Sequence, residues 1–510
     1  MIWFSKSDPG TRQDDANVDA LLRRGVECQD RGELNEAEEC YRQILAQQPE
    51  HSASRRQLAN LLAFRACALQ ERGELHDAIE GYEESLALDH AQAQVHGNLG
   101  NAYKSMGRTE EAIAAYREAI TVDAGQAEAH KNLATALVEM GERGQAIVHY
   151  RLALASRPSY AEASHSLGYL LEQEGDPAGA LECYRAAVAS KPDYAEAHWN
   201  LALQLLLLGE FEAGWKEYEW RTRLPNLERP WPYADREHWD GGTLEGKVIL
   251  LHAEQGFGDA IQFMRYAPLV AERGGRVIVS CQPKLKALLR EVQGVSAVLI
   301  EGEPPPPFDV CSSLMSLPRV FETTLRTIPA PIPYIRPNPE KARYWKGRLA
   351  AHGAALKVGL FWATDAKSTL SPLKSLTLDM LAPLGGVPGA MYFSLQQGAA
   401  AGQASHPPGG MAMVDLGAEL ADFSDTAALI SNLDLIVSID TATAHLAGAM
   451  GLPVWTLTHF PPDWRWLLGR DDSPWYPTMR LFRKGGADTW AQVVARVSEA
   501  LTVFVGKGAG

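Results

Sequence analysis

The sequence predicts an α + α/β protein, in which an N-terminal helical solenoid precedes an α/β region made of two halves. Two observations predict this class. A motif that begins with glycine recurs through the first 228 residues, and beyond residue 247 short apolar runs alternate with helical segments. A fixed period indicates stacked helical repeats, and strands alternating with helices indicate parallel sheets. We expect an N-terminal tail (1–17), a repeat array (18–228) and two α/β halves (229–340 and 341–510).

The recurring motif is a glycine, an alanine five residues later and a tyrosine four residues after that. Successive glycines are 41 residues apart once and then 34 residues apart, which predicts about six helix pairs whose first member is displaced or carries a longer helix. Glycine permits the tight turn, alanine the close approach of the helices, and tyrosine fills the gap to the next pair. The glycines are Gly32, Gly73, Gly107, Gly141, Gly175 and Gly209. The motif resembles the tetratricopeptide repeat, which implies a groove for a protein partner.

The negative charge is concentrated in this array. The chain has a net charge of −15, and residues 1–228 hold 22 basic and 37 acidic residues, a balance of −15, whereas the rest is neutral. Such a surface repels a phosphate backbone, so we expect no nucleic-acid partner. Two interpretations stay open: the acids attract a partner with basic patches, or they only solvate helix surfaces.

Cysteine usage and hydropathy indicate a cytoplasmic protein without a membrane span. The six cysteines are scattered and form no CxxC pair, which suits a reducing compartment and argues against zinc. The N-terminus does not read as a signal peptide, and the apolar run at 201–209 is too short to cross a bilayer.

Beyond a boundary segment rich in Pro, Trp and Gly (224–246), we expect two successive parallel sheets. Proline-rich stretches at 303–309 and 328–339 connect them, and the last helix is expected over 488–505. Ligands of open parallel sheets bind beyond the carboxyl ends of the strands, so the loops there are the candidates for a site. The expected strands are 247–253, 276–281, 296–300, 356–363, 390–396, 435–440 and 453–459.

The loop after the first strand contains Gly256, Gly258 and Asp259. It is not a dinucleotide fingerprint, because Ile261 stands at the third glycine position. The glycines allow the loop to run close to a ligand. Asp259, near a helix N-terminus where a carboxylate stays ionised, either caps that helix or acts as a general base.

Two loops of the second half carry polar groups suited to a nucleotide. The segment 362–376 supplies Thr364, Lys367 and Lys374, and a lysine there either offsets the charge of a leaving diphosphate or is simply solvated. Gln396, at the end of the next strand, offers an amide suited to a base or sugar edge.

The stretch SIDTATAH (438–445) places a strand end against a helix start. Backbone N–H groups of Thr441, Ala442 and Thr443 are expected to form an anion site, with phosphate as its natural occupant. Asp440 is expected to orient the turn or contact a sugar hydroxyl, and His445 either joins the site or is a buried, hydrogen-bonded histidine.

The loop 459–484, which is rich in tryptophan and arginine, follows the last expected strand. Its aromatic faces suit a sugar or base, and the alternative is a packed lid with arginines stacked on tryptophans.

The loop GFGDA, the turn SIDTATAH and the run FPPDWRWLLGRDDSPWYPTMRLFR resemble the glycosyltransferase family nine, or heptosyltransferase-like, catalytic region. This resemblance implies a glycosyltransferase-B fold of two Rossmann-like domains and an inverting, metal-independent transfer. It implies Asp259 as the base, Asp440, Thr441 and His445 in the nucleotide-sugar motif, and Lys374 or Lys367 as the phosphate-binding lysine. Heptosyltransferases often have glycine where Ala442 stands. The chain also has no Asp-x-Asp, the usual metal ligand of the other main transferase fold.

The layout of repeats followed by such a region is similar to bacterial protein O-glycosyltransferases, including those that modify flagellin. We therefore expect an enzyme without a cofactor, which moves a sugar from a nucleotide-sugar co-substrate to a hydroxyl, that of Ser or Thr in a protein held by the repeats. Two alternatives stay open. The acceptor is lipopolysaccharide or another glycan, or the α/β region is degenerate and the chain is a non-catalytic scaffold.

Overall fold

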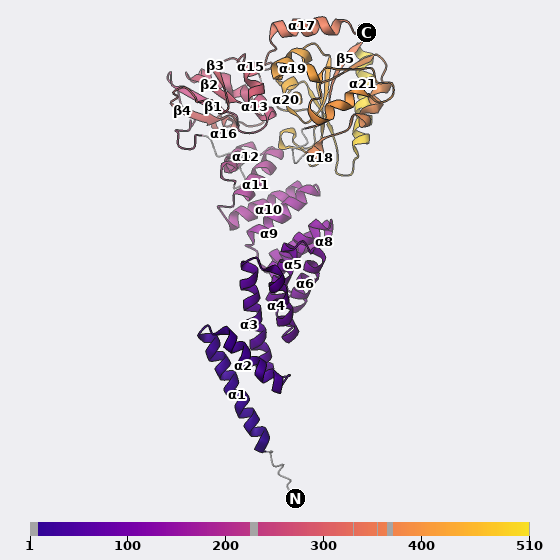
Figure 1. Cartoon of the computed structure of the whole chain (residues 1–510). Coiled ribbons are helices and arrows are strands. Elements are labelled where there is room, and N and C mark those ends of the chain that lie inside the picture. Colours follow the sequence, from indigo (N-terminus) through magenta and orange to yellow (C-terminus); the bar gives the residue numbers. More distant parts are fainter. Residues whose placement is uncertain (1–8, 225–232, 330, 354, 365–370, 509–510) are drawn as a thin grey trace. The chain divides into compact units, whose positions relative to one another are not determined.

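A computed structural model of the chain divides into two compact units (Figure 1). One unit comprises residues up to 171 together with 186–192, and the other comprises 172–185 and 193–510. The residues that the structure describes are 9–224, 233–329, 331–353, 355–364 and 371–508.

The first unit is a stack of paired helices, seen as the indigo and purple ribbons of Figure 1. Helices α9 (Ala161–Gln173) and α10 (Pro177–Ser190) contribute residues to both units. The other helices are α1 (Pro9–Asp30), α2 (Leu34–Gln47), α3 (Ser52–Glu71), α4 (Leu75–Leu88), α5 (Ala93–Ser105), α6 (Thr109–Val122), α7 (Ala127–Glu139) and α8 (Arg143–Ser156).

The glycine turns have the backbone conformation that only glycine adopts readily. All six leading glycines have φ between 75° and 84°. The alanines of the motif are fully buried, and its tyrosines are at most 3% exposed. The interpretation of these residues as turn and core positions is confirmed.

Two details of the array were open or wrong in the sequence-based prediction: the cause of the long first interval and the position where the first helix begins. The first interval is longer because α3 has 20 residues, whereas α5 and α7 have 13. A longer helix is therefore the correct alternative, but it belongs to the second helix pair (α3 with α4) and not to the first. The expected tail (1–17) is wrong in its second half, because α1 already begins at Pro9 and continues without a break to Asp30.

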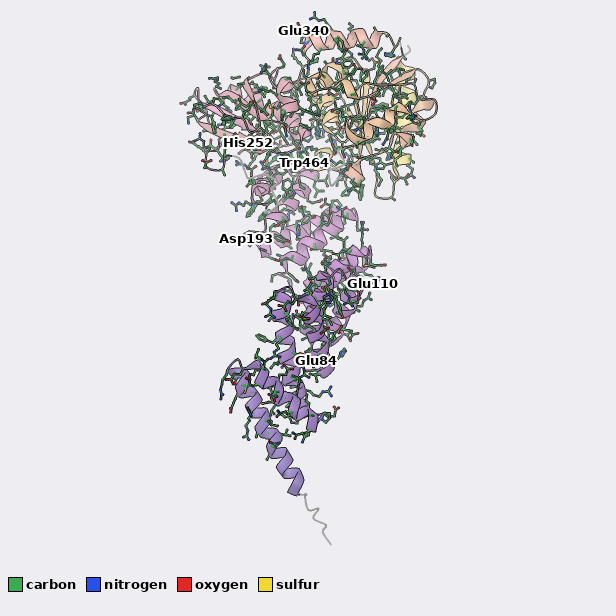
Figure 2. The ribbon with its side chains drawn as sticks, viewed as in Figure 1. Glu84, Glu110, Asp193, His252, Glu340 and Trp464 are labelled. Carbon is green, nitrogen blue, oxygen red and sulfur yellow. The ribbon has the colours of Figure 1, made fainter. Side chains whose placement is uncertain are left out.

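The last repeat belongs to the second unit, so a domain boundary at residue 228 is a further correction. It consists of α11 (Ala195–Leu207), α12 (Phe211–Tyr218) and a 3₁₀ turn η1 (Glu219–Arg223). Trp215 of α12 is 1% exposed and donates from Nε1 to the carbonyl of Thr323 at 3.0 Å. Its ring contacts the rings of Phe263, Trp464 and Trp475 (Figure 2 labels Trp464). Aromatic packing thus joins this repeat to the α/β region.

Within the described residues, the first α/β half has a four-stranded sheet in the order β3-β2-β1-β4, with every pair parallel. The strands are β1 (Val248–His252), β2 (Arg276–Cys281), β3 (Val295–Ile300) and β4 (Val310–Ser313). The helices of this half are α13 (Phe257–Phe263), α14 (Ala267–Glu272), α15 (Lys286–Leu289) and α16 (Leu317–Val320).

The second half has, in the part that the structure describes, a six-stranded parallel sheet in the order β10-β9-β8-β5-β6-β7. Its strands are β5 (Leu356–Phe361), β6 (Ala390–Ser394), β7 (Met413–Asp415), β8 (Leu435–Ile439), β9 (Val454–Thr458) and β10 (Met479–Arg483). Its helices are α17 (Pro339–Ala350), α18 (Ser371–Lys374), α19 (Phe423–Ile430), α20 (Ala442–Ala449) and α21 (Trp490–Gly508).

All seven expected strands are present, and three more were not anticipated. β4 and β7 have four and three residues, too short to give a periodic signal. β10 lies inside the segment 459–484 that was expected to be a loop, and it pairs with β9 in parallel register. The last helix, expected over 488–505, is α21.

Candidate active site

Both sheets reverse their strand order at their first strand. β1 lies between β2 and β4, and β5 lies between β6 and β8. Crevices at such switch points are where open α/β sheets bind ligands. Glu254 follows β1 and Asp440 follows β8, so each switch point has a carboxylate at its carboxyl edge.

Asp440 is the centre of a buried charge cluster on the second half. Its Oδ2 lies 2.8 Å from Nζ of Lys374, and its Oδ1 lies 3.9 Å from Nε2 of His445. Burial alone would raise the pKa of Asp440, but Lys374 and then His445 hold it well below its usual range. Burial would lower the pKa of Lys374, and Asp440 and Asp463 raise it. Asp440 is therefore a carboxylate with a fixed lysine partner.

The backbone of the turn after β8 has the predicted form. Thr441 is the N-cap of α20 and gives no side-chain cap, because its hydroxyl lies 3.0 Å from that of Ser438. Ala442 begins the helix and Thr443 is buried. The first N–H groups of α20 thus follow directly on Asp440, as an anion site requires.

His445 is a buried, hydrogen-bonded histidine. Its Nδ1 lies 2.9 Å from the hydroxyl of Tyr476, and its ring stacks on Trp466 with centroids 5.3 Å apart. Burial lowers the pKa of His445 to about 4. It is therefore neutral at pH 7, and its ring is held by Tyr476 and Trp466.

The two halves meet at Gly258. A Cβ built on this glycine would lie 2.8 Å from Cδ2 of His445 and 3.6 Å from Cα of Ala442. The start of α13 and the start of α20 therefore touch, and only a residue without a side chain allows this approach. Of the two expected loop glycines, Gly258 makes this contact and Gly256 is the N-cap of α13.

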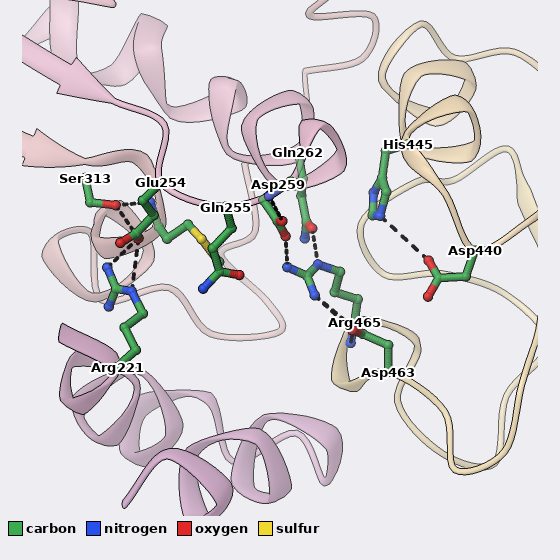
Figure 3. Close-up of polar contacts among 12 residues, drawn as sticks. Arg221, Glu254, Gln255, Asp259, Gln262, Ser313, Asp440, His445, Asp463 and Arg465 are labelled. Atoms are coloured by element: carbon green, nitrogen blue, oxygen red, sulfur yellow. Dashed lines mark hydrogen bonds and ion pairs between the residues drawn. The ribbon is translucent and has the colours of Figure 1, made fainter. Parts of the chain in front are cut away.

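Asp259 has partners for both carboxylate oxygens. Oδ2 accepts from the N–H of Gly256 at 2.9 Å, and Oδ1 forms an ion pair with Nη2 of Arg465 (Figure 3). Burial raises the pKa of Asp259 above its usual range, and Arg465 opposes that shift. The expected contact with the helix start is present, but it is the smaller influence, because Arg465 does more than the Gly256 N–H to favour the ionised form.

Arg465 joins the two halves. It lies in η8 (Trp464–Trp466) and is 8% exposed, and its Nε donates to Oε1 of Gln262 at 2.6 Å. Its Nη1 donates to both oxygens of Asp463, at 3.0 and 3.1 Å. Its guanidinium also lies 4.3 Å from the ring centroid of Trp464. One cation thus serves Asp259 and Asp463.

Three other expected residues have different outcomes. The Gln396 side chain accepts from the N–H groups of Trp362 and Ala363 and donates to the Ala363 and Gln397 carbonyls, so it ties strand ends together rather than facing a ligand. Thr364 bonds to Ser375 through its N–H, at 3.0 Å. Lys367 lies outside the described residues.

The tryptophans of 459–484 are packed. Trp464, Trp466 and Trp475 are 4%, 0% and 1% exposed, and Arg465 lies over the Trp464 ring, so the packed alternative holds for these side chains. Its arginine at 465 was missed as a site residue, although its position between two tryptophans could have indicated a buried cation.

Glu254 and Arg221 were also missed. Glu254 lies 9% exposed in the loop that supplies Asp259, and it is ion-paired with Arg221 of η1 at 2.8 Å. The strand-end rule applies to Glu254 as well as to Asp259, so the sequence did contain its signal. Arg221 had none, because η1 follows the degraded last repeat.

The described residues contain no group of three or more His, Cys, Asp or Glu able to hold a metal ion. None of their helices is long and apolar enough to cross a membrane.

The first unit has a separate groove. It has a volume of about 500 Å³ and lies among α4, α5 and α6. Leu86, Leu99 and three alanines give it apolar walls, and Glu83, Glu111 and Glu118 give it acidic ones.

The fold and these residues define a helical-repeat protein with a two-part α/β region. Models described as TPR repeat match residues 68–107, 100–141 and 173–209, and one described as tetratricopeptide repeat matches 131–182. The chain therefore contains tetratricopeptide repeats.

One curated relative spans more than the repeats. Protein FlbA of Caulobacter vibrioides is 27% identical over 330 residues, which cover 59% of this chain and 54% of that protein. The chain thus spans about half the length of the relative it matches.

Three solved structures are similar to part of the chain. PilF of Pseudomonas aeruginosa is 21% identical, covers 42% of this chain and is itself covered to 94%, with a TM-score of 0.32. YrrB, described as a TPR protein with an unusual peptide-binding site, is 21% identical, with coverages of 37% and 94% and a TM-score of 0.31. TTC0263 of Thermus thermophilus is 22% identical, with coverages of 37% and 99% and a TM-score of 0.24.

Proposed function

We propose that the chain is an inverting, metal-independent glycosyltransferase with a glycosyltransferase-B fold. It takes a sugar from a nucleotide-sugar donor and needs no cofactor. The observation that carries the proposal is the contact at Gly258, where the loop that bears Asp259 meets the helix start that follows Asp440. A transferase of this kind needs a base from one half close to a phosphate site from the other.

The donor diphosphate is proposed to bind at the start of α20. The N–H groups of Thr441, Ala442 and Thr443 at a helix start stabilise a bound anion. The ammonium of Lys374 forms an ion pair with Asp440, the residue that precedes this helix start. As the diphosphate leaves, it gains negative charge, which these groups stabilise more than they stabilise the bound donor. On binding, the phosphate competes with Asp440 for Lys374.

Asp259 is proposed as the base that takes the proton of the acceptor hydroxyl. Its raised pKa brings the carboxylate nearer to the range useful for proton transfer at neutral pH. In the structure, both of its oxygens have partners, so the acceptor must displace or share the Arg465 contact.

The acceptor is proposed to be a protein whose Ser or Thr is modified, flagellin being the candidate that the family resemblance suggests. The groove among α4, α5 and α6 supports a protein partner, because it combines apolar walls with Glu83, Glu111 and Glu118. It fits a segment in which an apolar residue stands beside a lysine or arginine.

The donor class is tested by melting temperature. UDP, GDP, ADP and CMP are added separately to the full chain, and the true nucleotide raises the melting temperature because it binds only the folded state. Asp259→Asn should then lower the transfer rate about 100-fold or more and leave that shift intact. If no nucleotide shifts the melting temperature, the proposal is wrong.

A protein-binding scaffold is the second candidate function. It is favoured by the closed pairs of Asp259 with Arg465 and of Lys374 with Asp440, which leave the proposed catalytic groups already satisfied. A chain that binds a partner protein but no nucleotide would identify this function. Transfer to purified lipopolysaccharide rather than to protein would identify a glycan acceptor.

A further inference from the structure

Glu254 occupies the switch point of the first sheet. It lies two residues beyond β1, and the hydroxyl of Ser313 at the end of β4 donates to its Oε1. Figure 3 shows Glu254 and Gln255, which lie in the loop between β1 and α13, together with Asp259 of the first turn of α13. The crevice rule therefore applies to this carboxylate as directly as to Asp259.

Only one oxygen of Glu254 is used. Oε1 accepts from Nε of Arg221 at 3.0 Å, from Nη2 of Arg221 at 2.8 Å and from Ser313. Across the described residues, Oε2 has neither a hydrogen bond nor an ion pair, and the Glu254 side chain is 9% exposed. Asp259 differs, because its two oxygens are both engaged.

The last repeat holds Glu254 in place. Arg221 is 2% exposed, and besides Glu254 it contacts the hydroxyl of Ser316, the carbonyl of Tyr218 and the carboxylate of Glu219. A guanidinium with this many fixed partners is rigid, so the orientation of Glu254 is set by a residue of the repeat array.

We propose that Glu254 is an acceptor-binding carboxylate and that Arg221 is its positioning residue. The open Oε2 accepts a hydrogen bond from the hydroxyl group of the acceptor and orients it beside Asp259. This inference rests on the proposed function and extends it, since it makes the last repeat a structural part of the acceptor site. No bond to Glu254 forms or breaks.

The first test measures the open oxygen without any activity. The full chain is labelled with carbodiimide and glycine ethyl ester, and the modified carboxylates are quantified by mass spectrometry. Glu254 should be modified in the folded chain although its side chain is only 9% exposed, because its Oε2 has no partner among the described residues. No modification of Glu254 in the folded chain would overturn the inference, whether or not the chain is a transferase.

The second test uses transfer from the nucleotide sugar whose nucleotide shifts the melting temperature, with a library of Ser- and Thr-containing peptides as acceptors. Glu254→Gln should lower kcat/KM for the peptides about 10- to 100-fold, with KM for the donor unchanged, because a hydrogen bond to a charged group is lost. Arg221→Met should produce a similar loss, and Arg221→Lys a smaller one. Arg223→Met, an exposed arginine of the same turn, is the matched control and should transfer normally.

The outcomes separate the two claims. If the wild-type chain transfers sugar and Glu254→Gln does so with unchanged kcat/KM for the peptides, the role of Glu254 is wrong and the proposed function stands. If the wild-type chain neither binds nucleotide nor transfers sugar, the proposed function is wrong, and the substrate role of Glu254 fails with it. Should Arg221→Met not fold, Glu254→Gln still decides the role, because its amide oxygen can still accept from Arg221.

Discussion

The ion pair between Arg465 and Asp259 joins the two α/β halves at the place where the candidate base lies. Arg465 is 8% exposed and also pairs with Asp463, so one buried guanidinium neutralises two carboxylates that are 20% and 25% exposed. Asp259 completes the arrangement by capping α13 through the N–H of Gly256. The pair therefore has two effects: it holds the two α/β halves in contact, and it favours the ionised form of Asp259.

Arg465→Met should lower the free energy of unfolding of the second unit by about 2 kcal/mol, because it leaves two partly buried carboxylates without their buried cation. Urea unfolding followed by tryptophan fluorescence measures this unit, since every tryptophan except Trp3 lies beyond residue 198. In active protein, the acidic limb of the pH–rate profile should move to higher pH. Arg470→Met, which breaks an exposed pair with Asp472, is the control and should cost less than about 1 kcal/mol. Equal losses in the two variants would contradict this account.

Strand positions and the helix start at Ala442 were predictable, because they depend on local apolar runs and turn residues. The environment of Asp259 was not. Its partner Arg465 lies 206 residues away in sequence, and no local pattern indicates that a cation between two tryptophans will reach across to the other half. Likewise, Gln396 is a residue type that is common at ligand sites and stands at a strand end. Only its hydrogen bonds to four backbone groups reveal a structural role.

Gly258→Ala should destabilise the second unit by about 1–3 kcal/mol and reduce transfer. The new Cβ would lie 2.8 Å from Cδ2 of His445, whose ring is held by Trp466 and Tyr476 and has no room to move aside. Gly347→Ala in α17 is the matched control. Nothing lies within 4 Å of its Cβ position, so it should be neutral or stabilising by about 0.5–1 kcal/mol. Urea unfolding compares the two, and a neutral Gly258→Ala would mean that the halves separate easily.

Trp215→Ala should lower the stability of the second unit by about 3–5 kcal/mol, although Trp215 belongs to the last repeat. The side chain is 1% exposed and contacts Phe263, Trp464 and Trp475, so its removal leaves a cavity between α12 and the α/β halves. The measurement is the urea midpoint from the remaining tryptophans. Tyr169→Ala in α9, 53% exposed, should leave that midpoint unchanged. A small effect of Trp215→Ala would show that the last repeat is only loosely attached.

Stability of the second unit should fall as the pH drops below 6.5, and His445 should account for part of the fall. Burial lowers the pKa of His445 from 6.5 to about 4 in the folded state, so between these values the unfolded chain binds a proton that the folded chain does not. The stabilisation from keeping this ring neutral is present in full above pH 6.5 and is lost as the pH falls toward 4, with a slope of about 1.4 kcal/mol per pH unit and a total of about 3 kcal/mol.

His445→Gln cannot titrate, so its free energy of unfolding should differ less between pH 7 and pH 5 than that of the wild type. His90→Gln is the control, because His90 is exposed in the first unit and should leave the pH dependence of the fluorescence-detected transition unchanged. Identical pH dependence in the wild type and His445→Gln would show that the ring is protonated with little cost in the folded state.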